Sequence, residues 1–259
     1  MSVSGQFVDS GDRRILLVWH ETAVECRSAV VVFPALTEEM NKSRRLLWDL
    51  GQRLAAEGVM LVVPDLSGTG DSEGEFLEAR WSHWCADMAA AKHWIAARGI
   101  TQVDALAVRF GACLYADCAD LWAADADYRL ACWQPELDGA KALKQLMRLK
   151  VMSDRVTWGE KTKLGDLQAT LKTAPVEIGG YQFHPELAAS ISQSTFDPAA
   201  LPTRVSGGLF DWSRPNDDEK PADGIKRFQA EGQRFWTAVE PEANERLVAD
   251  TGAFLAGAS

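Results

Sequence analysis

The sequence lacks most of what a disulfide framework, a zinc site or a membrane span would require. Among its 259 residues there are only five cysteines, an odd number, and no two are spaced as C-x-x-C. No apolar run approaches the ~20 residues of a spanning helix, because Pro34 interrupts the longest one, Ala29–Leu36. The first residues are polar and acidic where a secretory signal needs an apolar core. We therefore expect a cytoplasmic protein with reduced cysteines, no metal, no cofactor and no membrane association.

Positive charge is also scarce. The chain has 27 Lys and Arg residues against 37 Asp and Glu residues, which gives a net charge of −10. A protein that binds the phosphate backbone of nucleic acids needs a basic stripe, so no nucleic-acid partner is expected. The composition, 47% hydrophobic and 25% charged, is typical of a soluble globular chain of one or two domains.

Short β-rich runs alternate with helical patterns over the first half of the chain. Strands are expected at Ile15–Trp19, Ser28–Phe33, Val59–Pro64, Val103–Val108 and Tyr128–Trp133. Helices are expected at Asn41–Ala56, Trp81–Arg98 and Gly111–Asp125. This regular alternation predicts an α/β fold, with a mostly parallel central sheet and helices on both of its faces.

The alternation stops at Gly139, and from there to Leu201 the chain is helical and charged, with no clear buried strand. It resumes with a strand at Thr203–Leu209, and a final helix is expected at about Ala243–Leu255. We predict that 139–201 is a helical, lid-like insertion over the carboxyl edge of the sheet, where open α/β sheets bind ligands. An extra helical layer without a gating role is the alternative. The α/β core would then comprise residues 1–138 and 202–259.

One strand leads directly into a helix that starts with small residues, and Ala107 and Gly111 lie two residues either side of Arg109. This is the frame of a nucleophile elbow, G-x-S-x-G, in which a sharp strand-to-helix turn lifts the central residue above the sheet. Here the central residue is an arginine. Its guanidinium stays protonated, so it can neither attack a carbonyl nor act as a general base.

A Ser–His–acid triad on this frame also needs a histidine late in the chain. The last of the four histidines is His184, and Phe235–Glu240 stands where the catalytic histidine would be. His83 and His93 share the tryptophan-rich helix, where we expect structural roles, and His20 is expected at the surface. Two of the three triad positions are therefore vacant.

Arg109 would stand at the centre of the loops that meet at the carboxyl edge. It could anchor a carboxylate or phosphate ligand, or pair internally, because a buried arginine without a partner is costly. The internal partners considered are Glu38, Glu39 and Glu240. Candidate bases for activating water are Glu38, Glu39, Asp211 and Glu240, and the alternative nucleophile is Cys113. Ligand-binding candidates are Arg109, Asn41 and Asp138; Asp138 and Asp211 also suit turn or cap roles.

Six stretches carry a family resemblance: Glu38–Arg45, Asp65–Ser72, Ala79–Trp81, Trp133–Pro135, Gly180–Pro185 and Phe235–Thr237. In order and spacing they resemble the exosortase A system-associated hydrolase 2 family over nearly the whole chain. The resemblance implies an α/β-hydrolase fold and a bacterial origin, at loci for exopolysaccharide production and protein sorting. Arginine is usual at the elbow in that family. The chain departs from the family pattern at Phe33–Thr37, in the oxyanion-hole region, and in the short segment before Phe235.

Two functions remain open from the sequence. The first is an ester or thioester (acyl) hydrolase that acts on a small acyl ligand without the usual serine. The second is a catalytically inactive pseudo-hydrolase that binds an anionic ligand or a protein partner, with Arg109 as the anchor. The missing serine and the missing late histidine motivate the second function.

Overall fold

The computed structural model describes residues 2–122, 127–159, 162–212, 223–240 and 242–257. Eight strands form one sheet in the order β1-β2-β4-β3-β5-β6-β9-β10. Strands β4, β3, β5, β6, β9 and β10 run parallel, whereas β1 and β2 are antiparallel to their neighbours. Their bounds are Val3–Ser10 (β1), Arg13–His20 (β2), Ser28–Phe33 (β3), Val59–Pro64 (β4), Val103–Val108 (β5), Tyr128–Trp133 (β6), Val205–Asp211 (β9) and Ile225–Gln229 (β10). The expected mostly parallel central sheet is confirmed.

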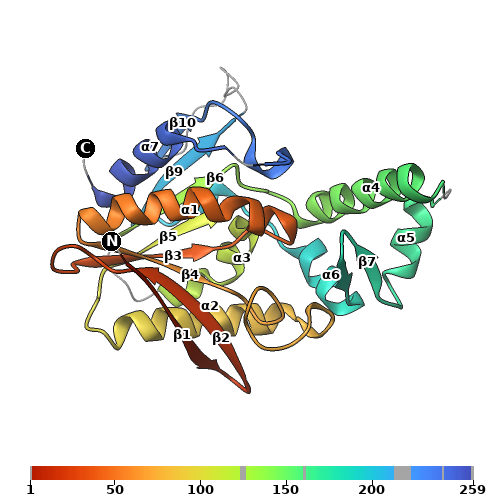
Figure 1. The fold of residues 1–259 in the computed structure, drawn as a ribbon, viewed down its shortest axis with the longest axis horizontal. Helices are drawn as coiled ribbons and strands as arrows, with labels where there is room; N and C mark the ends of the chain where they lie inside the picture. The colour runs from red at the N-terminus through yellow and green to blue at the C-terminus, as the bar shows by residue number, and fades with distance from the viewer. Residues whose placement is uncertain (1, 123–126, 160–161, 213–222, 241, 258–259) are drawn as a thin grey trace.

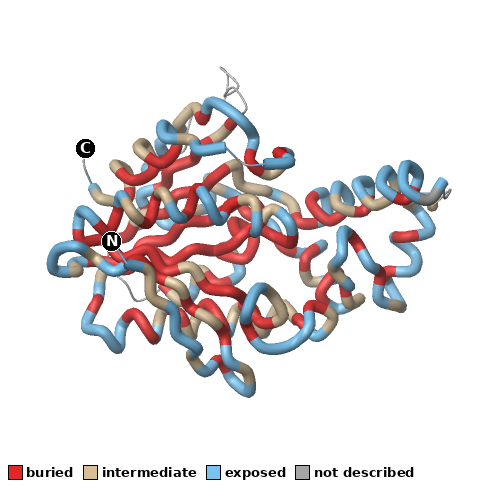
Figure 2. The backbone as a smooth tube through the Cα atoms, in the orientation of Figure 1, coloured by how far each residue is buried: buried red, intermediate tan, exposed pale blue. Residues whose placement is uncertain are grey.

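Both faces of the sheet are buried, because apolar residues fill consecutive positions of its central strands. In β3, Val30 and Val32 face one apolar cluster, and Val31 and Phe33 face the other. Helices α1 (Glu38–Ala56) and α7 (Glu245–Ala256) cover the first face. Helices α2 (Trp81–Ala96) and α3 (Gly111–Asp117) cover the second. Figures 1 and 2 show these three layers, with the buried backbone concentrated in the sheet.

The segment that follows β6 extends away from the sheet (Figure 1). It comprises α4 (Gly139–Trp158), α5 (Leu164–Thr170), the hairpin β7–β8 (Val176–Ile178 and Tyr181–Phe183) and α6 (Pro185–Gln193). The hairpin differs from the helical expectation. Gly179 and Gly180, at φ 62° and 86°, form its two-residue turn, and each of its strands is too short to give an apolar run.

Three further features differ from the expectations. Strands β1 and β10 lie at the two edges of the sheet and are only partly buried, so no apolar run marks them in the sequence. Helix α3 ends at Asp117 and a 3-10 turn follows at Ala119–Trp122; the remainder of the expected helix, 123–125, lies outside the described residues.

His20 is buried, which corrects the expectation of a surface position. Only 3% of the residue is exposed, and its ring lies 5.1 Å from that of Trp48. A Cβ at Gly51 of α1 would come within 2.2 Å of the imidazole, so the glycine makes room for it. Burial lowers the pKa of His20, and the neutral ring acts as a core residue.

Candidate functional site

The turn between β5 and α3 has the geometry of a nucleophile elbow. Arg109 adopts φ 54°, a left-handed conformation that is rare for residues other than glycine. Gly111, two residues further on, passes so close to β3 that a Cβ would lie 2.1 Å from the carbonyl oxygen of Phe33. The small residue that the motif requires is therefore needed for the chain to make this turn.

Backbone strain is concentrated at the same edge of the sheet. Among the described residues, the non-glycine residues with positive φ are Thr37, Arg109 and Gln134, at 54°, 54° and 42°. Each follows the carboxyl end of a central strand: β3, β5 and β6, respectively. Such strain gathers at functional sites, where the surrounding structure maintains it, so this edge is the candidate site.

The Arg109 guanidinium is held by acceptors from two other loops. Its Nε donates to Oε2 of Glu39 at 3.1 Å, and one terminal nitrogen donates to the carbonyl oxygen of Gln134 at 3.0 Å. The other terminal nitrogen forms an ion pair with Glu136. The exposed fractions of the three charged side chains are 7% for Arg109, 21% for Glu39 and 18% for Glu136. The elbow residue is thus buried and ion-paired within the chain.

An indole ring covers the same guanidinium. The 3-10 turn Phe235–Thr237 follows β10 and brings the ring of Trp236 to 4.5 Å from the guanidinium carbon. Lys42 fixes this turn by donating to the carbonyl oxygen of Trp236 at 3.3 Å. A cation–π contact therefore occupies the segment in which a hydrolase would carry its catalytic histidine.

The charge of the cluster is unbalanced, because two carboxylates share one guanidinium. Burial raises the pKa of Glu39, and the neighbouring Glu136 raises it further, while Arg109 acts in the opposite direction. Arg109 therefore offsets the cost of burying the Glu39 carboxylate beside a second one.

Little space remains above the elbow. The cavity beside it has a volume of about 20 Å³, enough for a single water molecule. Its walls include Leu36, Leu66, Trp84, Phe110, Leu114 and Tyr181. An acyl chain does not fit into this cavity without movement of its walls.

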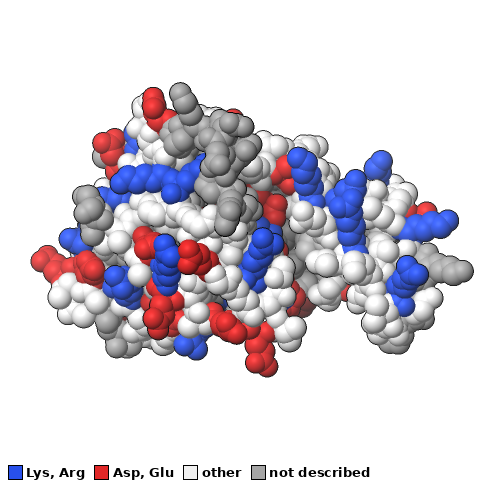
Figure 3. All heavy atoms as spheres, turned by 90° about the horizontal axis from the view of Figure 1, so that it is seen from above, with Lys and Arg blue, Asp and Glu red and all other residues white. Residues whose placement is uncertain are grey.

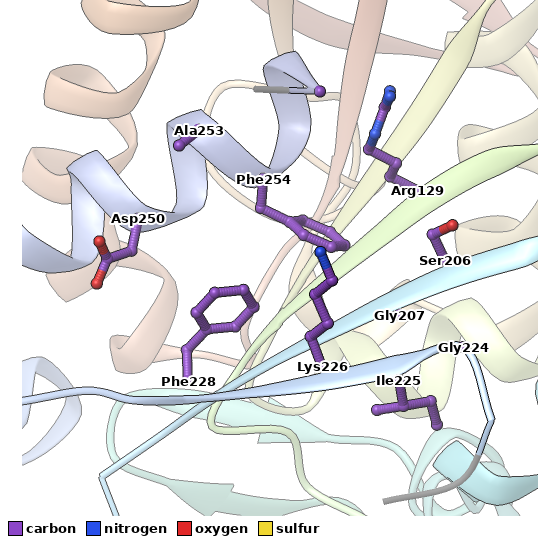
Figure 4. A pocket seen from close by; sticks show the side chains of 11 residues that line it. Arg129, Ser206, Gly207, Gly224, Ile225, Lys226, Phe228, Asp250, Ala253 and Phe254 are labelled. Atoms are coloured by element: carbon purple, nitrogen blue, oxygen red, sulfur yellow. The ribbon is translucent and has the colours of Figure 1, made fainter. Parts of the chain in front are cut away.

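A more spacious cavity, about 630 Å³, lies elsewhere (Figure 4). It is lined by the first residues of β6, β9 and β10 and by α7, and thus lies towards the amino ends of those strands. Arg129, Lys226 and Phe254 line it, and Arg129 is also ion-paired with the buried Asp104. Arg109 is not among its lining residues.

Of the carboxylates considered from the sequence, Glu39 is the one that contacts Arg109. Glu38 is exposed and accepts a 3.3 Å hydrogen bond from Asn41, which also donates to the Tyr181 hydroxyl. Glu240 is exposed on the chain segment after Trp236. Glu38 and Glu240, which were considered as internal partners of Arg109, make no ion pair with it in the described residues.

The two aspartates have local roles. Asp138 caps α4, because its side chain accepts a 3.0 Å hydrogen bond from the backbone N–H of Lys141, and it also pairs with the Lys141 ammonium. Asp211 is the last residue of β9, and its carbonyl oxygen accepts from the Ala230 N–H in the neighbouring chain segment. Neither makes an ion pair with Arg109 within the described residues, and Asp138 has the cap role that the sequence also suggested.

Sequence reasoning missed Glu136 as a partner of Arg109. Glu136 lies three residues beyond the end of β6, where its backbone N–H donates to the Arg109 carbonyl oxygen at 3.0 Å. The signal for it was available in principle, because acidic residues after neighbouring parallel strands converge at the same sheet edge.

The thiol of Cys113, the alternative nucleophile, is unreactive, and two serines of the loop after β4 are engaged in hydrogen bonds. Cys113 is fully buried and donates to the Glu136 carbonyl oxygen, and burial raises the pKa of its thiol to about 12. Ser67 donates to Asp87 through its hydroxyl at 3.0 Å, and Ser72 donates to the Asp65 carbonyl oxygen. His184, the last histidine, instead caps α6 by accepting from the Glu186 N–H. No cluster of His, Cys, Asp and Glu in the described residues forms a metal site.

The fold is the α/β-hydrolase fold, as comparison with solved structures shows. The ferulic acid complex of Est1E from Butyrivibrio proteoclasticus matches with a TM-score of 0.64 at 13% identity, over 96% of this chain and 97% of that one. Epoxide hydrolase A from Mycobacterium thermoresistibile matches with a TM-score of 0.58 at 15% identity, over 99% of both chains. A predicted CIB-like hydrolase from Thermoplasma acidophilum matches with a TM-score of 0.56 at 14% identity, over 99% of both chains.

These likenesses concern the fold alone, since all three identities are low. No protein-family model and no curated protein matches the sequence. None of the described helices is long and apolar enough to cross a membrane.

Proposed function

We propose that this chain is a non-catalytic α/β-hydrolase-fold protein that works by binding a protein partner. The observation that carries the proposal is Arg109 at the elbow, ion-paired with Glu39 and Glu136 and covered by Trp236. A group that cannot release its proton at this position cannot start acyl transfer. The late segment supplies an indole in place of the triad histidine, and burial raises the pKa of the Cys113 thiol, the alternative nucleophile, to about 12.

A protein partner fits these contacts better than a small anion bound by Arg109. All three guanidinium nitrogens already donate to acceptors within the chain. An incoming carboxylate or phosphate would have to displace Glu39 or Glu136 and leave that carboxylate buried without its partner, which is costly. The arginine is therefore interpreted as a structural replacement for the catalytic centre.

The finer identity rests on the sequence resemblance. Membership of the exosortase A system-associated hydrolase 2 family would make the chain a bacterial, cytoplasmic protein of an exopolysaccharide and protein-sorting locus. In that setting, a hydrolase fold without hydrolase chemistry serves as a scaffold that recognises another protein. Structural likeness to esterases and an epoxide hydrolase supports the shared fold and agrees with this interpretation.

The test is a turnover screen of the purified chain with p-nitrophenyl esters of several chain lengths and with acyl-CoA thioesters. We expect rates equal to those of protein-free buffer, and no change on Arg109→Met or Glu39→Gln substitution. Turnover by the wild type that is lost in either variant, under conditions in which that variant is folded, would overturn the proposal. Turnover that survives both substitutions is attributed to a contaminating esterase, and repurification then removes it.

Hydrolysis with Glu39 as the base is the second candidate. The raised pKa of Glu39 favours it, because a general base works best when its pKa approaches the working pH. Such a base alone contributes about 10²–10⁴-fold, and the 20 Å³ cavity leaves room for the attacking water only. A pH–rate profile whose acidic limb disappears in Glu39→Gln would favour this candidate over the first.

A further inference from the structure

Helix α4 has an exposed face that nothing in the described chain covers. It spans Gly139–Trp158, and it packs against α5, α6 and β7 while projecting from the core (Figure 1). On its outer side Leu149, Met152 and Val156 are 63%, 65% and 86% exposed. Steps of three and four residues place these three on one face of the helix. They form the apolar row of α4.

A row of cations runs beside the apolar row. Lys144, Arg148 and Arg155 are exposed, and their spacings of four and seven residues align them along α4. None of the three has an ion pair or hydrogen bond through its side chain within the part of the chain that the structure describes. By contrast, Lys141 pairs with Asp138, and Lys150 with Asp154 and Glu177. The unpaired cations form the basic row of α4.

This charge contrasts with that of the whole protein. Helix α4 contains five basic residues and one acidic residue, in a chain whose net charge is −10. Figure 3 shows Lys and Arg side chains gathered over the projecting segment, while Asp and Glu side chains lie mostly over the core. Association that is guided by such a patch selects a partner of opposite charge.

We propose that α4 docks an acidic amphipathic helix of a partner protein, which rests on the proposed function as a binding protein. The partner helix would lay an apolar stripe on Leu149, Met152 and Val156 and direct an adjoining acidic stripe towards Arg148 and Arg155. Recognition of a helix by apolar anchors at such spacing is a common mode of protein binding. The charged row beside the anchors fixes the orientation of the partner and excludes basic helices.

The one-sided arrangement favours a protein over a lipid surface. A helix that lies in a membrane interface buries a broad apolar face, whereas here the apolar row is three residues long and the cations lie on one side of it. An acidic helix satisfies both rows at once. The α4 face shares no residue with the Arg109 cluster. Peptide binding to α4 can therefore be measured independently of ester turnover.

The experiment uses the full chain and a fluorescent synthetic helix of about 20 residues, the length of α4, with leucines at three- and four-residue spacing and a neighbouring row of glutamates. Anisotropy titration measures its Kd at low and high salt. We expect saturable binding that weakens about tenfold in Arg148→Glu/Arg155→Glu and about as much in Leu149→Gln/Met152→Gln. These side chains are exposed, so unfolding temperatures should not change.

The matched control is Val24→Gln/Arg27→Glu, which alters one exposed apolar and one exposed basic residue in the loop after β2. Its Kd should equal that of the wild type. Equal weakening in this control, or equal binding of a peptide with glutamine in place of glutamate, would overturn the proposal. Binding to phosphatidylglycerol vesicles without peptide binding would assign the face to a lipid. A dimer in sedimentation that the α4 substitutions abolish would assign it to a second copy of the chain.

Failure of the two proposals can be distinguished. Peptide binding together with ester turnover that Glu39→Gln removes would refute the non-catalytic function and leave the docking face standing. The absence of both turnover and peptide binding would refute the docking face alone.

Discussion

Replacing Arg109 by methionine should destabilise the fold strongly. The substitution keeps an unbranched side chain under Trp236 but leaves Glu39 and Glu136 facing each other with exposed fractions of only 21% and 18%. Removing one member of a buried ion pair costs about 3–5 kcal/mol, because the remaining charge is left uncompensated. Loss of the contact between the guanidinium and the indole acts in the same direction. We expect the free energy of unfolding to fall by about 3–5 kcal/mol.

Urea denaturation followed by tryptophan fluorescence and far-UV circular dichroism measures this loss. In thermal unfolding it corresponds to a decrease of roughly 6–20 °C in Tm for a chain of this size. The matched control is Arg109→Met/Glu39→Gln/Glu136→Gln, which removes the carboxylate charges as well. Apolar and neutral replacements of a complete ionic cluster are often tolerated, so most of the stability should return.

The pH dependence gives the reasoning a second test. Without Arg109, the pKa of Glu39 should rise further, since the arginine lowers it more than the neighbouring Lys42 does. Arg109→Met should therefore cost less at pH 5.5 than at pH 7.5, because protonation removes the uncompensated charge. A loss below about 1 kcal/mol at neutral pH, within the range of ordinary surface substitutions, would refute the interpretation of the cluster. The interpretation would also be refuted if the free energy of unfolding of the triple variant were no higher than that of Arg109→Met alone.

Four further outcomes are expected. Arg109→Ser should show no ester hydrolysis above buffer in a stopped-flow assay, because no imidazole is available to activate the hydroxyl; a burst of product would contradict this. Gly111→Ala should lower the free energy of unfolding by about 2 kcal/mol or more, because its Cβ would lie 2.1 Å from the Phe33 carbonyl oxygen; an unchanged urea midpoint would count against the elbow geometry. Cys113, with its pKa raised to about 12, should resist iodoacetamide in the folded chain, which peptide mass mapping can check. The pKa of Glu39 is also raised by burial, so its contribution to stability is present below its unfolded pKa and is lost as pH rises through the folded value; the urea midpoint of the wild type should gain more between pH 7.5 and 5.5 than that of Glu39→Gln.

The layered core could be predicted from the sequence because its strands are buried on both faces. Ala29–Phe33 is a continuous apolar run, and Val103–Val108 is apolar except for Asp104; such runs allow few alternatives once helical patterns alternate with them. The elbow was equally visible, since Gly111 and Ala107 frame the central residue. Small residues at these two positions are a local signal, because the backbone is crowded at such a turn.

The edges of the sheet could not be predicted in the same way. Strand β10 has one buried residue, Ile225, and its position comes from parallel pairing with β9. The hairpin around Gly179 and Gly180 has strands of three residues each, so its turn can be recognised but its strands cannot. Such elements are fixed by tertiary pairing more than by local preference.

In the candidate site, too, local features could be predicted from the sequence, whereas contacts between distant segments could not. The sequence indicated that a buried Arg109 would need a carboxylate, and Glu39 was among the three considered. It gave no way to choose Glu39, because the register of α1 against β5 decides which carboxylate reaches the guanidinium. Glu136 and the stacking of Trp236 depend on loops that meet only in the folded chain. Likewise, the burial of His20 depends on the gap left by Gly51 on another element.

The central claim, that the Arg109 guanidinium is locked by carboxylates, is tested most directly by the exchange rate of its Nε proton. Heteronuclear NMR of the arginine side chains measures this rate, and Arg109→Lys assigns the resonance. We expect slow exchange with solvent at neutral pH and a marked acceleration in Glu39→Gln, because Nε donates to Glu39. Exchange as fast as that of the exposed Arg27, or a rate that Glu39→Gln leaves unchanged, would contradict the account.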